Sequence, residues 1–125
     1  MKFDPRPYAE HYRAENVAEL SAIRERASAA LVEARRLAER ILREDSGVRA
    51  VILFGSLAED GPRRKDFDID LALEGGDLYK ALDSVEDSAF DVDVVQLDRL
   101  PAHILARIDA RGIVLAGSRT ETEEG

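Results

Sequence analysis

The sequence predicts an α+β fold, in which a small mixed β-sheet carries helices on one side and is preceded by a long N-terminal helix. Residues 17–44 repeat apolar side chains at steps of three and four, the period of an amphipathic helix. The runs 48–54, 67–73 and 90–97 are either apolar and β-branched or alternate between apolar and polar residues, which is typical of strands. Helical patterns separate the second and third runs and follow the third, so helices and strands belong to one layered domain.

The long helix is predicted over 17–44, with Asn16 as its N-cap and Ser46–Gly47 as its stop. No glycine or proline interrupts this stretch, and charged residues fill the side opposite the apolar stripe. We expect the stripe to pack in the core, and an interface with a helical partner is the alternative. The preceding residues 1–15 combine aromatic and charged side chains with two prolines, and we interpret them as an arm or a short helix.

Turn and cap signals predict the remaining elements. Gly61–Pro62 marks a turn between the first two strands, and Gly75–Gly76 closes the second strand. Asp77 is placed to cap a short helix with an apolar face. The last helix is expected over 100–110, with a proline in its first turn and a glycine at its end. Residues 113–115 are an optional fourth strand.

These elements divide the chain into three parts. Residues 1–46 form the arm and long helix, which pack on the core or extend from it. Residues 47–116 form the core itself. Residues 117–125 end in a tail that lacks apolar side chains, and we expect this tail to be disordered. A chain of 125 residues has room for a single domain.

Composition excludes several classes of protein. The net charge of −8 opposes broad binding to nucleic acid, whose phosphates would be repelled, and favours a basic protein partner. Cysteine is absent, which rules out disulfides and cysteine-based zinc sites. No apolar run reaches the roughly 18 residues that a membrane span needs. The N-terminus shows no apolar leader, so we expect a cytoplasmic protein.

The residues that indicate chemistry lie between the first two strands. The first strand ends in Gly55–Ser56, and the second carries Asp68 and Asp70 at alternate positions. Side chains two apart on a strand leave the same face, roughly 6.5–7 Å from each other. Two carboxylates held in this way repel one another, and a cation between them would remove that cost. With oxygen ligands and no cysteine, the favoured ion is a hard one such as Mg²⁺ or Mn²⁺.

A third carboxylate is available from the next strand. Asp91 and Asp93 share one face of the run 90–97, and either can join the first pair if the two strands are neighbours. Three carboxylates can hold two metal ions roughly 3.5–4 Å apart, an arrangement suited to in-line displacement at phosphorus. The Gly55–Ser56 turn supplies backbone amides and a hydroxyl that can bind phosphate oxygens.

Together these residues resemble the nucleotidyltransferase superfamily related to DNA polymerase β, and in particular its minimal members, the MNT antitoxins of HEPN/MNT toxin–antitoxin pairs. The family pattern is a strand, Gly-Ser, a loop, Asp-x-Asp and a later aspartate in an apolar strand. Gly55, Ser56, Asp68 and Asp70 match it, and Asp93 fits the last position better than Asp91 does. The resemblance covers residues 48–115 and implies a nucleotidyltransferase-like sheet.

The resemblance also implies an activity. Gly55 and Ser56 would bind the triphosphate of ATP, Asp68 and Asp70 would ligate both Mg²⁺ ions, and Asp93 would ligate the catalytic ion and help to deprotonate the attacking hydroxyl. The chain would then be an ATP-binding, Mg²⁺-dependent protein adenylyltransferase. In the toxin–antitoxin members, AMP is transferred to a tyrosine of the HEPN ribonuclease toxin. On this basis we expect no direct contact with nucleic acid or membrane, and the long helix leaves a homo-oligomer open.

Two departures from the pattern affect the expected activity. Eleven residues separate Ser56 from Asp68, and a loop accommodates one more than the usual ten or so at little cost. Many minimal members carry arginine at the position of Glu59. At about 4 Å, two unit charges interact by about 1 kcal/mol in water and about 4 kcal/mol at an effective dielectric constant of 20. Glu59 is therefore expected to oppose the triphosphate, and Arg63, Arg64 and Lys65 are candidates to replace the cation.

This substitution keeps a second function open. Glu59 together with the long helix favours a catalytically weak or silent antitoxin that neutralises its partner by binding alone. Transfer to a small molecule is a third reading, but nucleotidyltransferases that modify antibiotics usually carry an additional substrate domain, for which this chain has little room. The acceptor and the nucleotide base are not determined by the sequence.

Overall fold

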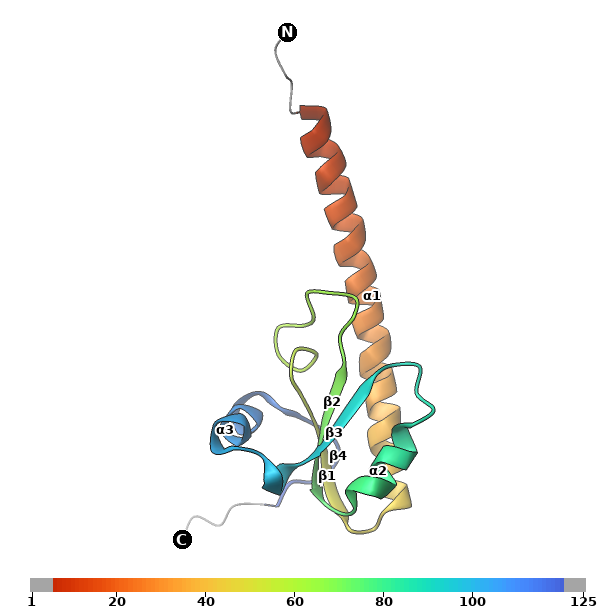
Figure 1. Cartoon of the computed structure of the whole chain (residues 1–125), viewed down its shortest axis with the longest axis vertical. Coiled ribbons are helices and arrows are strands. Elements are labelled where there is room, and N and C mark those ends of the chain that lie inside the picture. The colour runs from red at the N-terminus through yellow and green to blue at the C-terminus, as the bar shows by residue number, and fades with distance from the viewer. Residues whose placement is uncertain (1–5, 121–125) are drawn as a thin grey trace.

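The computed structural model describes residues 6–120, which form three α-helices, a short 3₁₀ helix and four strands (Figure 1). In chain order the elements are α1 (Arg6–Glu44), β1 (Val48–Phe54), β2 (Ile69–Gly75), α2 (Leu78–Val85), β3 (Val92–Gln96), η1 (Leu97–Arg99), α3 (Ala102–Arg111) and β4 (Ile113–Gly117). The α+β class, the mixed sheet and the preceding long helix are confirmed.

The sheet has the strand order β3-β2-β1-β4. Strand β1 is antiparallel to both β2 and β4, whereas β2 and β3 are parallel. The parallel pair is possible because α2 returns the chain to the start of the sheet. Asp70 on β2 therefore lies between Phe54 on β1 and Asp93 on β3 in the hydrogen-bonding register.

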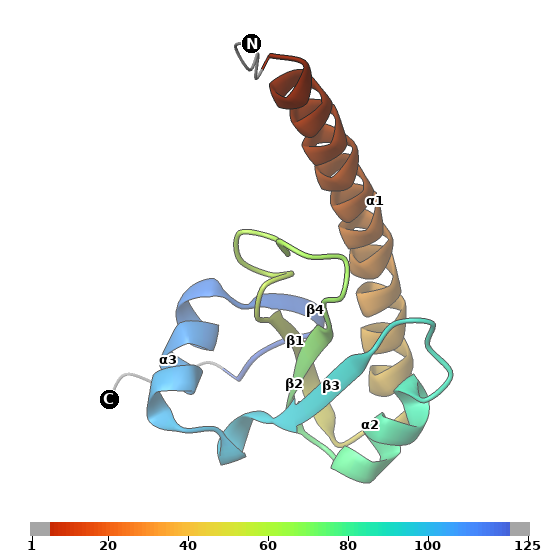
Figure 2. The ribbon, with the colours of Figure 1, turned by 45° about the horizontal axis from the view of Figure 1, so that its top comes forward.

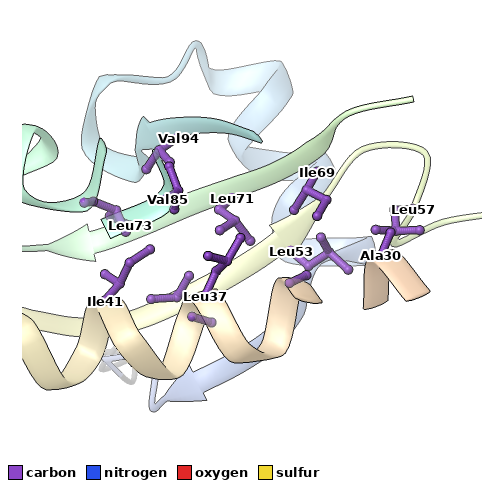
Figure 3. Packing of buried hydrophobic residues seen from close by; sticks show 14 of the residues in the cluster. Ala30, Leu37, Ile41, Leu53, Leu57, Ile69, Leu71, Leu73, Val85 and Val94 are labelled. Atoms are coloured by element: carbon purple, nitrogen blue, oxygen red, sulfur yellow. The ribbon is translucent and has the colours of Figure 1, made fainter. Parts of the chain in front are cut away.

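Helices cover both faces of the sheet, which differs from the predicted one-sided arrangement. Helices α1 and α2 pack on one face, where Leu37 and Ile41 of α1 meet Leu53, Leu71 and neighbouring side chains (Figure 3). Helix α3 packs on the other face through Ile108, against alternate residues of β1 and β2. The reason is that β1 is apolar at successive positions, and a strand whose two faces are both apolar has to be covered on both sides.

Helix α1 begins about ten residues earlier than predicted. Asn16 lies inside the helix and does not cap it, and the expected arm from residue 6 onward is helical. The chain between Tyr8 and Glu44 contains neither glycine nor proline, so nothing stops the helix from extending. Pro7 lies in the first turn, where a missing amide hydrogen costs no helical bond. Residues 1–5 of the predicted arm lie outside the described part of the chain.

Only the C-terminal part of α1 packs against the sheet. The buried residues run from Ile23 to Ile41, whereas Val17 is 66% and Leu20 is 52% exposed. The N-terminal part of the helix projects beyond the sheet, past the loop that connects β1 and β2 (Figures 1 and 2). The prediction that the stripe packs in the core is thus met over the second half of the helix.

The shorter elements follow their predicted signals. Asp77 caps α2 by accepting a 2.8 Å hydrogen bond from the Tyr79 amide. Helix α3 lies between Pro101 and Gly112, and β4 adds a fourth strand at the sheet edge. The first residues of the predicted disordered tail belong to the fold, because Gly117 ends β4 and the Ser118 amide donates a hydrogen bond to the Arg49 carbonyl. Residues 121–125 of that tail lie outside the described residues.

The division into an N-terminal part, a core and a tail stays a prediction. Within residues 6–120, no helix combines the length and the hydropathy needed to cross a membrane.

Candidate active site at the end of strands β1 and β2

The Gly55–Ser56 turn directly follows β1. Gly55 has a φ of +78°, in the left-handed region that favours glycine. A Cβ added there would overlap Oδ2 of Asp70 and lie 3.2 Å from its Cγ. The carbonyl of Gly55 accepts hydrogen bonds from the amides of Ala58 and Glu59, which closes a single helical turn. Glycine is therefore required by both the backbone and the neighbouring carboxylate, and Ser56 is left exposed at the mouth of the turn.

The structure brings the predicted carboxylates together. Asp70 and Asp93 are direct partners in the parallel β2–β3 register, and Asp68 comes just before β2. Their apolar neighbours Ile69 and Val94 point to the face covered by α1, so alternation turns the carboxylates to the opposite face. Three acidic side chains thus share the end of the sheet at which Gly55 lies.

The proximity of these carboxylates, together with burial, shifts their pKa values. Burial raises the pKa of Asp70 to about 6, with further contributions from the charges of Asp93 and Asp68. The pKa of Asp68 is also raised, first by loss of hydration and then by the charges of Asp93 and Asp91 and a hydrogen bond with Asp93. Carboxylates that repel one another in this way are stabilised by a bound cation.

The choice between Asp91 and Asp93 depends on register. Asp91 precedes β3 and is exposed, and its carbonyl accepts a 2.8 Å hydrogen bond from the Ile69 amide. Its side chain acts on Asp68 only through its charge. Asp93 is the carboxylate that lies beside Asp70, and this supports its choice as the third member of the group.

Aromatic packing fixes the segment that carries Asp68. Phe67 is buried, and its ring lies 6.4 Å from that of Phe90, which comes just before β3. The guanidinium of Arg26 on α1 lies over both rings, 4.6 Å from the centre of Phe90 and 6.0 Å from that of Phe67. Arg26 also donates a 3.1 Å hydrogen bond to the Lys65 carbonyl. Helix α1 thereby holds the loop before β2 and the start of β3 in one place.

Asp68 and Asp70, but not Asp93, line a cleft of about 550 Å³, together with the Gly55–Ser56 turn and the loop that follows the turn. Glu59 also lines this cleft, and its negative charge is paired with Arg107 of α3. Its carboxylate accepts three hydrogen bonds of 2.8–3.1 Å from Nε and Nη2 of Arg107 on α3. Arg107 lowers the pKa of Glu59. The expected repulsion between Glu59 and a triphosphate is thus offset by a residue that sequence reasoning missed.

The other predicted cations have different environments. Arg63 and Arg64 are exposed and line the cleft, whereas Lys65 does not. The pairing of Arg107 with Glu59 could not be predicted from local patterns, because the two residues lie 48 positions apart. Its place on α3, next to the buried Ile108 and about one turn from the partly buried Ile104, was the available signal.

The donor set fits a divalent metal ion. Asp68, Asp70 and Asp93 offer only carboxylate oxygens, which Mg²⁺ and Mn²⁺ prefer. Among residues 16–120, whose side chains the structure describes, no three acidic or histidine side chains are already closed around a common point. Asp68 and Asp93 are exposed, however, and their carboxylates are therefore able to turn toward an ion shared with Asp70.

The raised pKa of Asp70 makes stability depend on pH. The pKa of the Asp70 carboxyl is 3.8 in the unfolded chain and about 6 in the folded protein. Between these values the folded state binds more protons, so the free energy of unfolding falls as the pH rises. We expect Asp70→Asn to remove this loss and to raise the free energy of unfolding at pH 7.5 by up to about 3 kcal/mol. Urea unfolding at pH 4 and pH 7.5 measures the difference, and the exposed Asp83→Asn is the control. Equal gains at both pH values would contradict the prediction.

Comparison with known proteins identifies the family to which the chain belongs. Residues 38–121, about two-thirds of the chain, match the family model for polymerase beta nucleotidyltransferases. A search of curated proteins finds no significant match. Among solved structures, the chain is similar to a toxin–antitoxin with AMP-PNP, with a TM-score of 0.56, 22% identity and coverage of 68% of this chain and 74% of that one. A mutant of the toxin–antitoxin MntA-HpeT gives a TM-score of 0.51 and 22% identity over 63% of this chain and 69% of that one.

At this identity the two structures show a shared fold. The family match is independent of them and spans β1, β2 and β3, the strands that carry the turn and the carboxylates. The chain therefore belongs to the polymerase beta nucleotidyltransferase family.

Proposed function

We propose that this protein is a Mg²⁺-dependent nucleotidyltransferase that transfers AMP from ATP to a tyrosine hydroxyl of a HEPN-type ribonuclease toxin, and so acts as the antitoxin in the cytoplasm. The observation that carries the proposal is the grouping of Asp68, Asp70 and Asp93 beside the Gly55–Ser56 turn. Two solved structures of similar fold are of a toxin–antitoxin, and one of them is with AMP-PNP. They favour ATP as the nucleotide and a toxin as the partner.

The residues divide the chemistry between them. The amides after Gly55 and the hydroxyl of Ser56 bind phosphate oxygens of the nucleotide. Asp68, Asp70 and Asp93 would hold two Mg²⁺ ions, which neutralise charge on the phosphates and activate the attacking oxygen. Asp93 accepts the proton of the acceptor hydroxyl. The hydroxyl oxygen then forms a bond to the α-phosphorus, the bond between the α-phosphorus and its bridging oxygen breaks, and pyrophosphate leaves.

Helix α1 offers a route for the partner to reach this site. Its projecting half leaves the domain at the end where the β1–β2 loop lies (Figure 2), and Arg26 joins the helix to that loop. Val17, Leu20 and Val32 are exposed apolar residues on α1. A partner bound along this helix would hold its acceptor hydroxyl beside the carboxylates.

Labelled ATP tests the proposed transfer. The protein, Mg²⁺ and the product of the neighbouring gene are incubated with ATP labelled at the α- or the γ-phosphate. We expect the partner to be labelled from the α-phosphate only, and at tyrosine. Label from the γ-phosphate would show a kinase instead, and no label with any nucleotide would contradict nucleotidyl transfer.

The exposed apolar residues of α1 also favour a second function, neutralisation by binding alone. Val17 and Leu20 are 66% and 52% exposed and would be covered by a toxin or by a second copy of this protein. The variant Asp68→Asn with Asp70→Asn separates the two functions. If the folded variant still protects cells from the toxin, binding is sufficient, whereas loss of protection with retained complex formation shows that transfer is needed.

A further inference from the structure

The ion pair between Glu59 and Arg107 gives the cleft a positive surface where the sequence places a negative charge. The Arg107 side chain is 69% exposed, whereas the Glu59 side chain is 14% exposed. A molecule that enters the cleft therefore meets the guanidinium first. Glu59 lies beneath it and holds it in place.

The guanidinium keeps free donors in this arrangement. Arginine has five N–H groups in a planar fork, and the pair with Glu59 uses Nε and Nη2. Among the side chains of residues 16–120, Glu59 is the only one that accepts a hydrogen bond from this guanidinium. The remaining donors are available to an anion, and a fork that is already oriented loses little entropy on binding one.

The position of Arg107 coincides with the turn that approaches phosphate. Arg107 lines the 550 Å³ cleft together with Gly55, Ser56 and Asp70. It also lines a smaller adjoining cavity of about 210 Å³, whose other walls include Phe54 and Ile108. It thus stands at the edge of the carboxylate site, on the side away from β3.

The lining of the cleft carries more negative than positive side chains. Five carboxylates and three arginines line it in the described chain. Arg63 and Arg64 lie in the exposed loop that follows the Gly55–Ser56 turn. Arg107 is held by a helix and a bidentate ion pair, so it is the arginine whose position is already set.

We propose that Arg107 binds the terminal phosphates of the nucleoside triphosphate, and that it does so from above Glu59, whose carboxylate it covers. This inference rests on the proposed function, because it assigns a ligand group to the same site. Glu59 was expected to oppose the triphosphate because it stands where many minimal members carry arginine. Under this proposal, Arg107 of α3 supplies the missing positive charge.

Nucleotide titration tests the role of Arg107. The probes are MgATP and AMP, and calorimetry measures their dissociation constants for the wild type and Arg107→Ala. Loss of a charged hydrogen-bond donor should weaken MgATP binding by roughly 10- to 100-fold. AMP lacks the terminal phosphates, so its binding should not change. Arg107→Lys keeps the charge but loses the fork, and its affinity for MgATP should lie between the two.

The control is Arg43→Ala, which removes an exposed arginine near the opposite end of β1. Its affinity for MgATP should equal that of the wild type, and thermal melts confirm that each variant is folded. If Arg107→Ala binds MgATP as the wild type does, or loses AMP equally, the assignment is wrong. If the wild type binds neither nucleotide, the proposed function itself fails.

A double-variant cycle tests the part played by Glu59. When Arg107 is absent, the carboxylate of Glu59 faces the phosphates and repels them. The change Arg107→Ala should therefore weaken MgATP binding less in a Glu59→Gln background than in the wild type. An equal loss in both backgrounds would show that Glu59 does not contribute to the phosphate-binding surface.

Discussion

Asp93→Asn is expected to lower the rate of AMP transfer by about 10²- to 10⁴-fold, which is the usual contribution of a positioned general base. Asparagine has nearly the same shape but accepts no proton, and it provides a weaker ligand for a metal ion. Asp93 lies beside Asp70 in the β2–β3 register, so the change acts at the centre of the carboxylate group. The measurement is single-turnover transfer of label from ATP to the partner.

The matched control is Asp91→Asn. Asp91 lies two residues earlier, is exposed and acts on Asp68 only through its charge, while its backbone carbonyl keeps the bond to Ile69. Transfer by this variant should stay within about threefold of the wild-type rate, since one exposed charge contributes little. Equal losses of transfer rate in the two variants, or a larger loss in Asp91→Asn, would show that Asp93 is not the third carboxylate of the site.

Gly55→Ala is expected to reduce transfer by about 10²-fold, because displacement of a reacting group by about 1 Å has an effect of that size. The added methyl group would overlap Oδ2 of Asp70. Either the turn that binds phosphate or the carboxylate has to move, and both belong to the site. Transfer assays at saturating ATP, together with the metal dependence of the rate, measure the result.

Gly61→Ala separates this clash from backbone strain. Gly61 has a φ of +84°, close to the +78° of Gly55, but no atom lies within 4 Å of an added Cβ. Both variants should lose roughly 1–2 kcal/mol of stability from the left-handed conformation. Only Gly55→Ala should lose activity as well. If the two variants lose activity equally, the close approach of Gly55 to Asp70 has no functional role.

The sequence by itself determined the elements and most of the site. Gly55 and Ser56 follow an apolar strand, and Asp68 and Asp70 sit at alternate positions before and within the next strand, so local patterns were sufficient to predict a turn beside two carboxylates. Strand alternation is a property of neighbouring residues, and it survives in any tertiary arrangement. Helix α1 begins earlier than predicted because Pro7 is compatible with the first turn of a helix, and neither glycine nor proline follows it before Glu44.

Only the tertiary structure decided which charges meet. The register of β3 against β2 places Asp93, rather than Asp91, beside Asp70, and a shift of two residues along the strand would reverse that choice without changing any local pattern. The pairing of Glu59 with Arg107 joins residues 48 positions apart through the packing of α3 on the sheet. A sequence shows the sign of each charge, but interaction energies depend on distance and burial, and these exist only once the chain has folded.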